Sequence, residues 1–242
     1  MHKKGLKLSV TNSYLIEAGG TYLLIDTGYQ EDWALFRKRL DEVGVRLSEI
    51  GYLLLTHHHD DHCGLLNQVV EANPGVRVIL SHRAKGVLLA GKNDTSHHPR
   101  FINSRVRLLF SLIRLFDQRW KDHPFPPYQA RKTDILLQGD TCFNEIGIGL
   151  NGKMIETPGH SLDSISIVFE DGDCLAGDAA ANFPSFFGTK YCVILIEDLG
   201  TYYQSWRKLL SEGARQIYPA HGKPFPAEKL RENMGKIKSV AP

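Results

Sequence analysis

The stretch from Thr56 to Gly64 contains the densest group of metal-binding residue types in the chain, and it follows an apolar run typical of a buried strand. In an extended segment, side chains two positions apart share a face, so His57 and His59 can converge on one ion. Where the chain turns into a helix, Asp61 and His62 are carried to a neighbouring position and could hold a second ion. The spacing therefore predicts a two-metal site.

Four ligands from one segment cannot complete two coordination spheres, so further ligands must come from downstream. The chain offers three candidates, each at the end of a predicted strand or in the turn after it: His160, Asp178 and His221. The simplest alternative is that the histidine run is a tag or a solvated loop. A tag would lie at a terminus and would lack the interleaved aspartates.

The order and spacing of these residues resembles the metallo-β-lactamase superfamily of dinuclear metallohydrolases. Two further stretches support the resemblance: residues 24–28, with the sequence LIDTG, look like the early aspartate motif of the family, and residues 157–161, with the sequence TPGHS, look like its second metal motif. The resemblance covers nearly the whole chain. It implies an α+β fold, a four-layer αβ/βα sandwich of two mixed β-sheets flanked by helices, in a single domain spanning residues 1–242.

The resemblance also implies which residue holds which ion. His57, His59 and His160 would hold one metal, Asp61, His62 and His221 the other, and Asp178 would bridge both. Imidazole and carboxylate ligands favour two divalent zinc ions, with manganese or iron as alternatives. A solvent molecule bridging two such ions would be largely hydroxide at neutral pH, and Asp61 is the expected catalytic residue that orients it. His58 and Asp60 occupy variable positions of the motif and are expected outside the metal coordination.

The similarity to glyoxalase II and the lactonases, which use this full ligand set, favours hydrolysis of an ester, a thioester or a lactone. The large apolar insertion at residues 84–131 favours a substrate with a hydrophobic portion. Two features depart from those relatives. The glutathione-binding helical domain of glyoxalase II has no counterpart after His221, and the lactonases carry a tyrosine where this chain has Ala181. Tyr191 is a candidate replacement from the same loop.

Three other activities are compatible with the motif. A persulfide dioxygenase would use one iron held by His57, His160 and Asp178. A phosphodiesterase would use the same dinuclear site. A metal-dependent binding or scaffold protein would keep the site without catalysing a reaction. The full ligand set argues against the scaffold, since degenerate sites usually lose ligands.

Residues 84–131 interrupt the strand–helix rhythm and are predicted to form a helical insertion rich in apolar residues and arginines. Three roles compete for it: a lid over the metal cleft, a homodimer contact through the helix at 100–120, and a membrane-surface element. The aromatic loop after Asp178 supplies the expected substrate-binding residues, which are Phe183, Phe186 and Tyr191. Core packing is the alternative role for at least two aromatic residues of this loop.

Composition limits the partners. The 242 residues have a net charge of +2 and a pI near 8.3, which argues against a nucleic-acid binder driven by bulk charge. No apolar run reaches the roughly 18 residues of a membrane span, so stable membrane insertion is not expected. The basic N-terminus does not lead into a signal-peptide pattern. Together with four scattered cysteines, this predicts a cytoplasmic enzyme of a small-molecule substrate.

The remaining apolar patterns predict the elements that position the site. Predicted strands cover residues 6–10, 14–17, 22–26, 51–56, 76–80, 135–137, 146–148, 154–156, 164–169 and 174–177, and a strand ends at 218. Predicted helices cover residues 31–43, the segment from the histidine motif to Asn73, the surroundings of Trp206, and the last stretch through Leu230, Met234 and Ile237. By resemblance, Asp26 lies beneath the metal site. A turn aspartate that caps its own backbone is the alternative.

Overall fold

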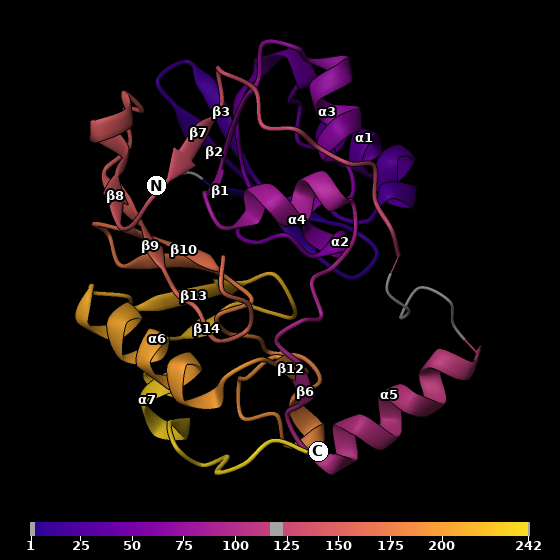
Figure 1. Cartoon of the computed structure of the whole chain (residues 1–242). Helices are drawn as coiled ribbons and strands as arrows, with labels where there is room; N and C mark the ends of the chain where they lie inside the picture. The colour runs from indigo at the N-terminus through magenta and orange to yellow at the C-terminus, as the bar shows by residue number, and fades with distance from the viewer. Residues whose placement is uncertain (1–2, 117–122, 242) are drawn as a thin grey trace. The chain divides into compact units, whose positions relative to one another are not determined.

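The computed structural model describes residues 3–116 and 123–241. The chain divides into two compact units, one made of Met1–Asn93 and Pro124–Met154, the other of Asp94–His123 and Ile155–Pro242. Figure 1 labels the helices and strands of both units. Each unit has its own buried apolar cluster. The chain passes between the units three times, and the last crossing, after Met154, falls within the strand β9 (Gly152–Glu156).

The first sheet begins with an antiparallel meander and continues as a parallel sheet. Its six strands, in spatial order, are β1 (Lys3–Lys7), β2 (Asn12–Ala18), β3 (Thr21–Ile25), β4 (Ile50–Leu54), β5 (Arg77–Ser81) and β7 (Ile135–Leu137). The β2–β3 turn contains Gly19 and Gly20, both with positive φ, as a tight hairpin requires. The helices of this unit are α1 (Trp33–Glu42), α2 (Asp60–Cys63), α3 (Leu66–Ala72) and α4 (Ala84–Ala90), with short 3-10 turns at Gln30–Asp32 and Leu47–Glu49.

The second sheet also has six strands. In spatial order they are β14 (Phe225–Pro226), β13 (Gln216–Pro219), β11 (Asp173–Gly177), β10 (Ile165–Phe169), β9 and β8 (Thr141–Cys142). The β11–β13 pair is parallel, whereas the pairs β10–β11, β13–β14 and β8–β9 are antiparallel. The other elements are α5 (Ser104–Phe116), α6 (Leu199–Ser211), α7 (Glu228–Asn233), a ribbon of β6 (Arg100–Phe101) with β12 (Leu195–Ile196), and 3-10 turns at Phe143–Ile146 and Ser185–Phe187. Two mixed sheets flanked by helices confirm the predicted fold class.

Three local predictions were wrong. The first strand is Lys3–Lys7 rather than 6–10, because a turn closed by the Leu8 N–H and the Thr11 carbonyl follows it. Residues 146–148 form no strand, because Ile146 ends a 3-10 turn and Gly147 adopts a left-handed conformation. The last helix ends at Asn233, before Met234 and Ile237, and Gly235 then takes a positive φ that no helix contains.

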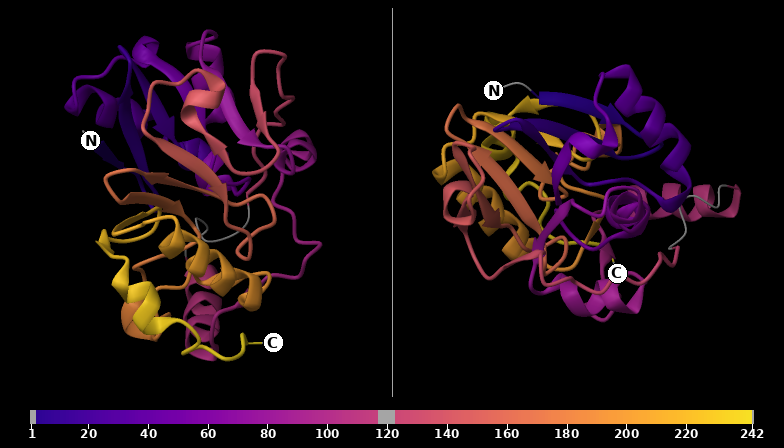
Figure 2. Two further views of the ribbon diagram at one scale, coloured as in Figure 1. Left: turned by 90° about the vertical axis from the view of Figure 1, so that its left-hand side faces the viewer. Right: turned by 90° about the horizontal axis from the view of Figure 1, so that it is seen from above.

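The predicted insertion at 84–131 is divided between the units. Helix α4 belongs to the first unit, whereas α5, drawn in magenta in Figure 2, belongs to the second. Val106 and Phe110 of α5 are buried in the core of the second unit. On α5, Leu108 is 64% and Leu112 50% exposed. Residues 117–122 of the predicted run lie outside the described residues. No helix in the described part of the chain is long and apolar enough to cross a bilayer. The lid, dimer and membrane-surface roles, like the single-domain description, stay predictions.

Candidate metal centre

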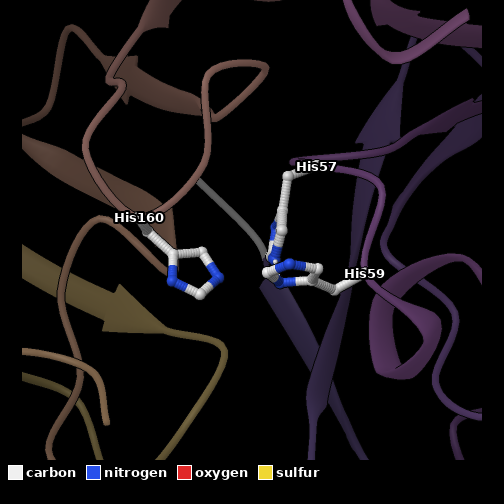
Figure 3. A group of neighbouring side chains, drawn as sticks. All are labelled: His57, His59 and His160. Carbon is white, nitrogen blue, oxygen red and sulfur yellow. Dashed lines mark hydrogen bonds between the residues drawn. The ribbon is translucent and has the colours of Figure 1, made fainter. Parts of the chain in front are cut away.

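The segment after β4 brings two imidazoles together, as the sequence spacing predicts. His57 Nε2 lies 3.0 Å from His59 Nδ1, so one nitrogen of each ring points to the same place. Figure 3 shows both side chains and also draws His160 of the second unit. The other ring nitrogen of His57, Nδ1, is 3.1 Å from the Thr56 hydroxyl. Two converging imidazole nitrogens are donors of the kind that zinc binds.

Asp26 orients His62 from beneath. Asp26 Oδ2 lies 2.8 Å from His62 Nδ1 and also accepts a hydrogen bond from the Thr56 hydroxyl at 2.8 Å. Asp26 Oδ1 accepts a hydrogen bond from the Thr56 N–H at 2.8 Å. An N–H on Nδ1 that donates to a carboxylate leaves Nε2 as the lone-pair nitrogen, 3.6 Å from Asp61 Oδ2. Asp26 has φ +57°, unusual for a residue with a side chain. The predicted supporting position of Asp26 is therefore confirmed, and the self-capping alternative is wrong.

Asp61 has a partner that the sequence pattern did not reveal. The buried Thr11, in the turn between β1 and β2, donates its hydroxyl to Asp61 Oδ2 at 3.1 Å. A lone threonine in a turn carries no sequence signal, so only the tertiary structure could find it. By contrast, Asp60 exchanges hydrogen bonds with the amide side chain of Asn93. The His58 carbonyl accepts a hydrogen bond from the Cys63 thiol. The Asp60 side chain and the His58 backbone are therefore held by protein groups.

The second unit brings its three predicted ligands together from three loops. His160 follows β9, Asp178 follows β11 and His221 follows β13. Asp178 Oδ2 lies 3.3 Å from His160 Nε2, and Asp178 Oδ1 lies 3.4 Å from His221 Nε2. His160 Nδ1 donates to the Leu195 carbonyl at 2.9 Å, so its Nε2 is the nitrogen with the lone pair. One carboxylate between two imidazole nitrogens is the arrangement expected of a bridging ligand.

Helix α6 contributes two side chains that sequence reasoning missed as parts of the site. The Tyr202 hydroxyl donates to the Asp178 carbonyl at 3.0 Å, and the Trp206 indole donates to the Ala179 carbonyl at 2.6 Å. Burial raises the pKa of Tyr202 well above its usual range, so the phenol stays a neutral donor. The sequence pattern predicted only a helix around Trp206 and gave neither residue a role in the site.

The three predicted substrate-binding residues differ in exposure. Phe186 is 79% exposed and Phe183 44%, whereas Tyr191 is partly buried and stacks on Phe225 with ring centroids 4.5 Å apart. The ring of Tyr191 therefore packs against a core residue, whereas the side chains of Phe183 and Phe186 are exposed. A substrate contact of these residues stays a prediction.

The donor set fits metal ions. All seven predicted ligands belong to histidine and aspartate groups that could hold an ion. His62 and His160 each have a hydrogen bond at Nδ1 that sets the tautomer and leaves Nε2 for a metal, as is usual for metal-binding histidines. Imidazole with carboxylate suits zinc, and the donor types also accept manganese or iron.

Comparison with known proteins assigns the family. Residues 6–221 match the model of the metallo-beta-lactamase superfamily, and the chain belongs to this superfamily. One relative is the "Beta-lactamase-like protein 2 homolog" of Drosophila melanogaster, 26% identical over 238 residues, which cover 96% of this chain and 63% of that protein. Another is the "Atrochrysone carboxyl ACP thioesterase AacuM" of Aspergillus aculeatus, 27% identical over 93% of this chain and 54% of that protein. A third, the "Probable metallo-hydrolase YqjP" of Bacillus subtilis, is 25% identical over 88% of this chain and 67% of that protein.

Solved structures agree on the fold. A metallo-beta-lactamase superfamily protein of Sulfolobus tokodaii, ST1585, has a TM-score of 0.64 at 18% identity over 98% of this chain and 86% of that one. The metallo-beta-lactamase SMB-1 has a TM-score of 0.62 at 16% identity over 90% and 76%. The chain spans roughly half to two thirds of the length of the first curated relatives that it matches.

Proposed function

We propose that this chain is a dinuclear metal-dependent hydrolase that cleaves an ester, a thioester or a lactone with a hydrophobic portion. The observation that carries the proposal is the complete ligand set: four donors after β4 and three in the second unit, each with an imidazole nitrogen or a carboxylate presented for binding. Membership in a superfamily that includes a named metallo-hydrolase supports it.

Within this proposal, His57, His59 and His160 would hold one ion, and Asp61, His62 and His221 would hold the other. Asp178, whose two oxygens each face a histidine nitrogen, would be a ligand to both. Two zinc ions would supply Lewis acidity, which lowers the pKa of coordinated water to about 7 and polarises the substrate carbonyl.

The protein's own residues orient and move protons. Asp26 and Thr56 keep His62 in one tautomer, so its lone pair always faces the same way. Asp61, held by the Thr11 hydroxyl, accepts the proton of the attacking water and returns it to the leaving alkoxide or thiolate. The water oxygen forms the bond to the acyl carbon as the carbon–oxygen or carbon–sulfur bond breaks.

The substrate preference rests on two features. One relative is named as a thioesterase that acts on a carrier protein, which supports a thioester as the first substrate class to test. Four large apolar side chains of the second unit are exposed, namely Phe183 and Phe186 and, on α5, Leu108 and Leu112. This exposed apolar surface suits a substrate with an apolar acyl chain.

The test is metal content and hydrolysis measured on the same preparation, purified without a metal-affinity tag. We expect about two zinc ions per chain by plasma mass spectrometry and hydrolysis of acyl thioesters and esters that increases with acyl length. Asp178→Ala should lose metal and reduce kcat/KM by at least about 100-fold, whereas His97→Ala, at an exposed loop position, should change neither. One iron per chain, with oxygen consumed in the presence of persulfides, would contradict the proposal in favour of a dioxygenase.

A further inference from the structure

One face of α6 donates hydrogen bonds to the backbone of two loops that carry predicted metal ligands. Tyr202 and Trp206, one turn apart, reach the consecutive carbonyls of Asp178 and Ala179. Ser205 donates its hydroxyl to the Pro158 carbonyl at 2.7 Å, two residues before His160. Tyr202 and Trp206 have no exposed surface, and their rings lie 5.6 Å apart.

The His160 loop lies very close to the backbone of α6. Gly159 has φ +126°, and a Cβ placed there would lie 2.4 Å from the Tyr202 nitrogen. The Gly159 carbonyl accepts the N–H groups of Glu197 and Asp198, the two residues that lead into the helix. The loop is therefore clamped between the start of α6 and the side chain of Ser205.

The loop of the third ligand is tied to the same segment. The Asn182 N–H donates to the His221 carbonyl at 2.9 Å, and the Ala220 N–H donates to the Gly177 carbonyl at 3.2 Å. Gly222 lies so close to Asn182 that a Cβ would approach its carbonyl carbon to 2.5 Å. Support from α6 at residues 178 and 179 consequently reaches the His221 loop through the 177–182 segment.

From this convergence we infer that the α6 face formed by Tyr202, Ser205 and Trp206 is a positioning platform, which holds the loops of His160 and Asp178 in their metal-binding arrangement before any ion is present. None of these side chains binds the metal. They act by satisfying the carbonyls of residues whose side chains do, so the arrangement costs no reorganisation when the ion enters. The inference rests on the proposed function in one respect, that the positioned ligands bind metal.

The helix supplies a matched control for the experiment. Tyr203 is the neighbour of Tyr202, is also buried, and donates its hydroxyl to the backbone, but it does so to Ile237, which is neither a predicted ligand nor next to one in sequence. Tyr202→Phe and Tyr203→Phe each remove one hydroxyl from the same helix. Ser205→Ala and Ser211→Ala form a second, milder pair, since the Ser211 hydroxyl only bonds back to Lys208 within the helix.

Three quantities are measured on the four variants and the unmutated chain: the zinc dissociation constant by competition with a chromophoric chelator, the thermal midpoint of the metal-free protein, and backbone amide exchange of residues 157–161 and 177–182 without metal. We expect Tyr202→Phe to weaken zinc binding about 10-fold or more, Ser205→Ala to weaken it less, and the two controls to leave it unchanged. Exchange of 177–182 should rise in Tyr202→Phe but not in Tyr203→Phe.

The outcomes separate this inference from the proposed function. Equal zinc affinities for Tyr202→Phe and Tyr203→Phe would overturn the platform. It would also be overturned if both variants lost zinc affinity in proportion to equal losses of thermal midpoint. If the unmutated chain binds no metal, the proposed function fails. In that case the amide exchange measurement still tests the inference. Unchanged amide exchange of residues 177–182 in Tyr202→Phe would refute the positioning of these loops by α6.

Discussion

The two units hold their predicted ligands in different ways. In the first unit, four ligands come from one continuous segment, and side chains orient them: Asp26 and Thr56 contact His62, and Thr11 contacts Asp61. In the second unit, three ligands come from three separate loops. There most of the support goes to the backbone, because the donors of α6 bind the carbonyls of residues 158, 178 and 179, while the Leu195 carbonyl orients the ring of His160.

The difference follows from chain connectivity. Residues that are adjacent in sequence share one strand end and one helical turn, so local geometry already brings them together, and only their ring orientation needs support. Loops that meet from distant positions must first be fixed as backbone, since conformational freedom there would disperse the ligands. Substitutions in the first unit should therefore act mainly on metal affinity, and those in the second on stability as well.

The largest expected effect is on the second unit. Gly159→Ala places a Cβ against the Tyr202 backbone at a positive φ, and we expect it to lower the free energy of unfolding by about 3–5 kcal/mol in chemical denaturation. Gly213→Ala is the control, because Gly213 also has a positive φ, +89°, but nothing within 4 Å of the added Cβ. It should cost only about 1–2 kcal/mol. Similar losses at both positions would mean that the Gly159 loop can retreat from α6.

A smaller effect is expected for the carboxylate under His62. Asp26→Asn keeps the size of the side chain but removes the charge that sets the His62 tautomer, and zinc affinity should fall about 10- to 100-fold. The chelator competition described above measures it on the metal-loaded protein. Asp32→Asn is the control, since Asp32 is a buried aspartate of the same unit that binds Ser9 and the Tyr29 N–H instead of a ligand. If Asp32→Asn weakened zinc as much, general destabilisation rather than orientation would explain the loss.

The smallest effect concerns Thr11. Thr11→Val removes the hydroxyl that donates to Asp61 with almost no change of shape, and one such bond is worth about 1 kcal/mol, so kcat should fall several-fold, about 3- to 10-fold. Thr11→Ser retains the hydroxyl and should recover most of the rate. Metal content should remain unchanged in both variants, and a valine variant as active as the serine variant would exclude a role for the bond.

Much of this protein was predictable because its pattern is local. Period-two and period-three-to-four apolar spacing located β3, β4, β10, β11 and α1 to within a few residues, and it predicted a helix around Trp206, where α6 lies. The errors fell where a single backbone conformation decided the outcome, as at Gly147 and Gly235, whose positive φ values no apolar pattern encodes. The first strand was displaced because its register is set by pairing of Leu6 with Ser13 across the meander, a contact between residues that local periodicity does not relate.

The sequence by itself determined the donor chemistry: which histidines and aspartates exist, that four of them share one strand-to-helix turn, and that three more stand at strand ends. It could not determine what orients them. Thr11, Tyr202, Ser205 and Trp206 are ordinary residue types at ordinary positions, and they became relevant only when folding brought their donors to an Asp61 oxygen and to three loop carbonyls. The physical reason is that a ligand is recognised by its own chemistry, whereas a supporting hydrogen bond is defined only by which two distant groups the fold places together.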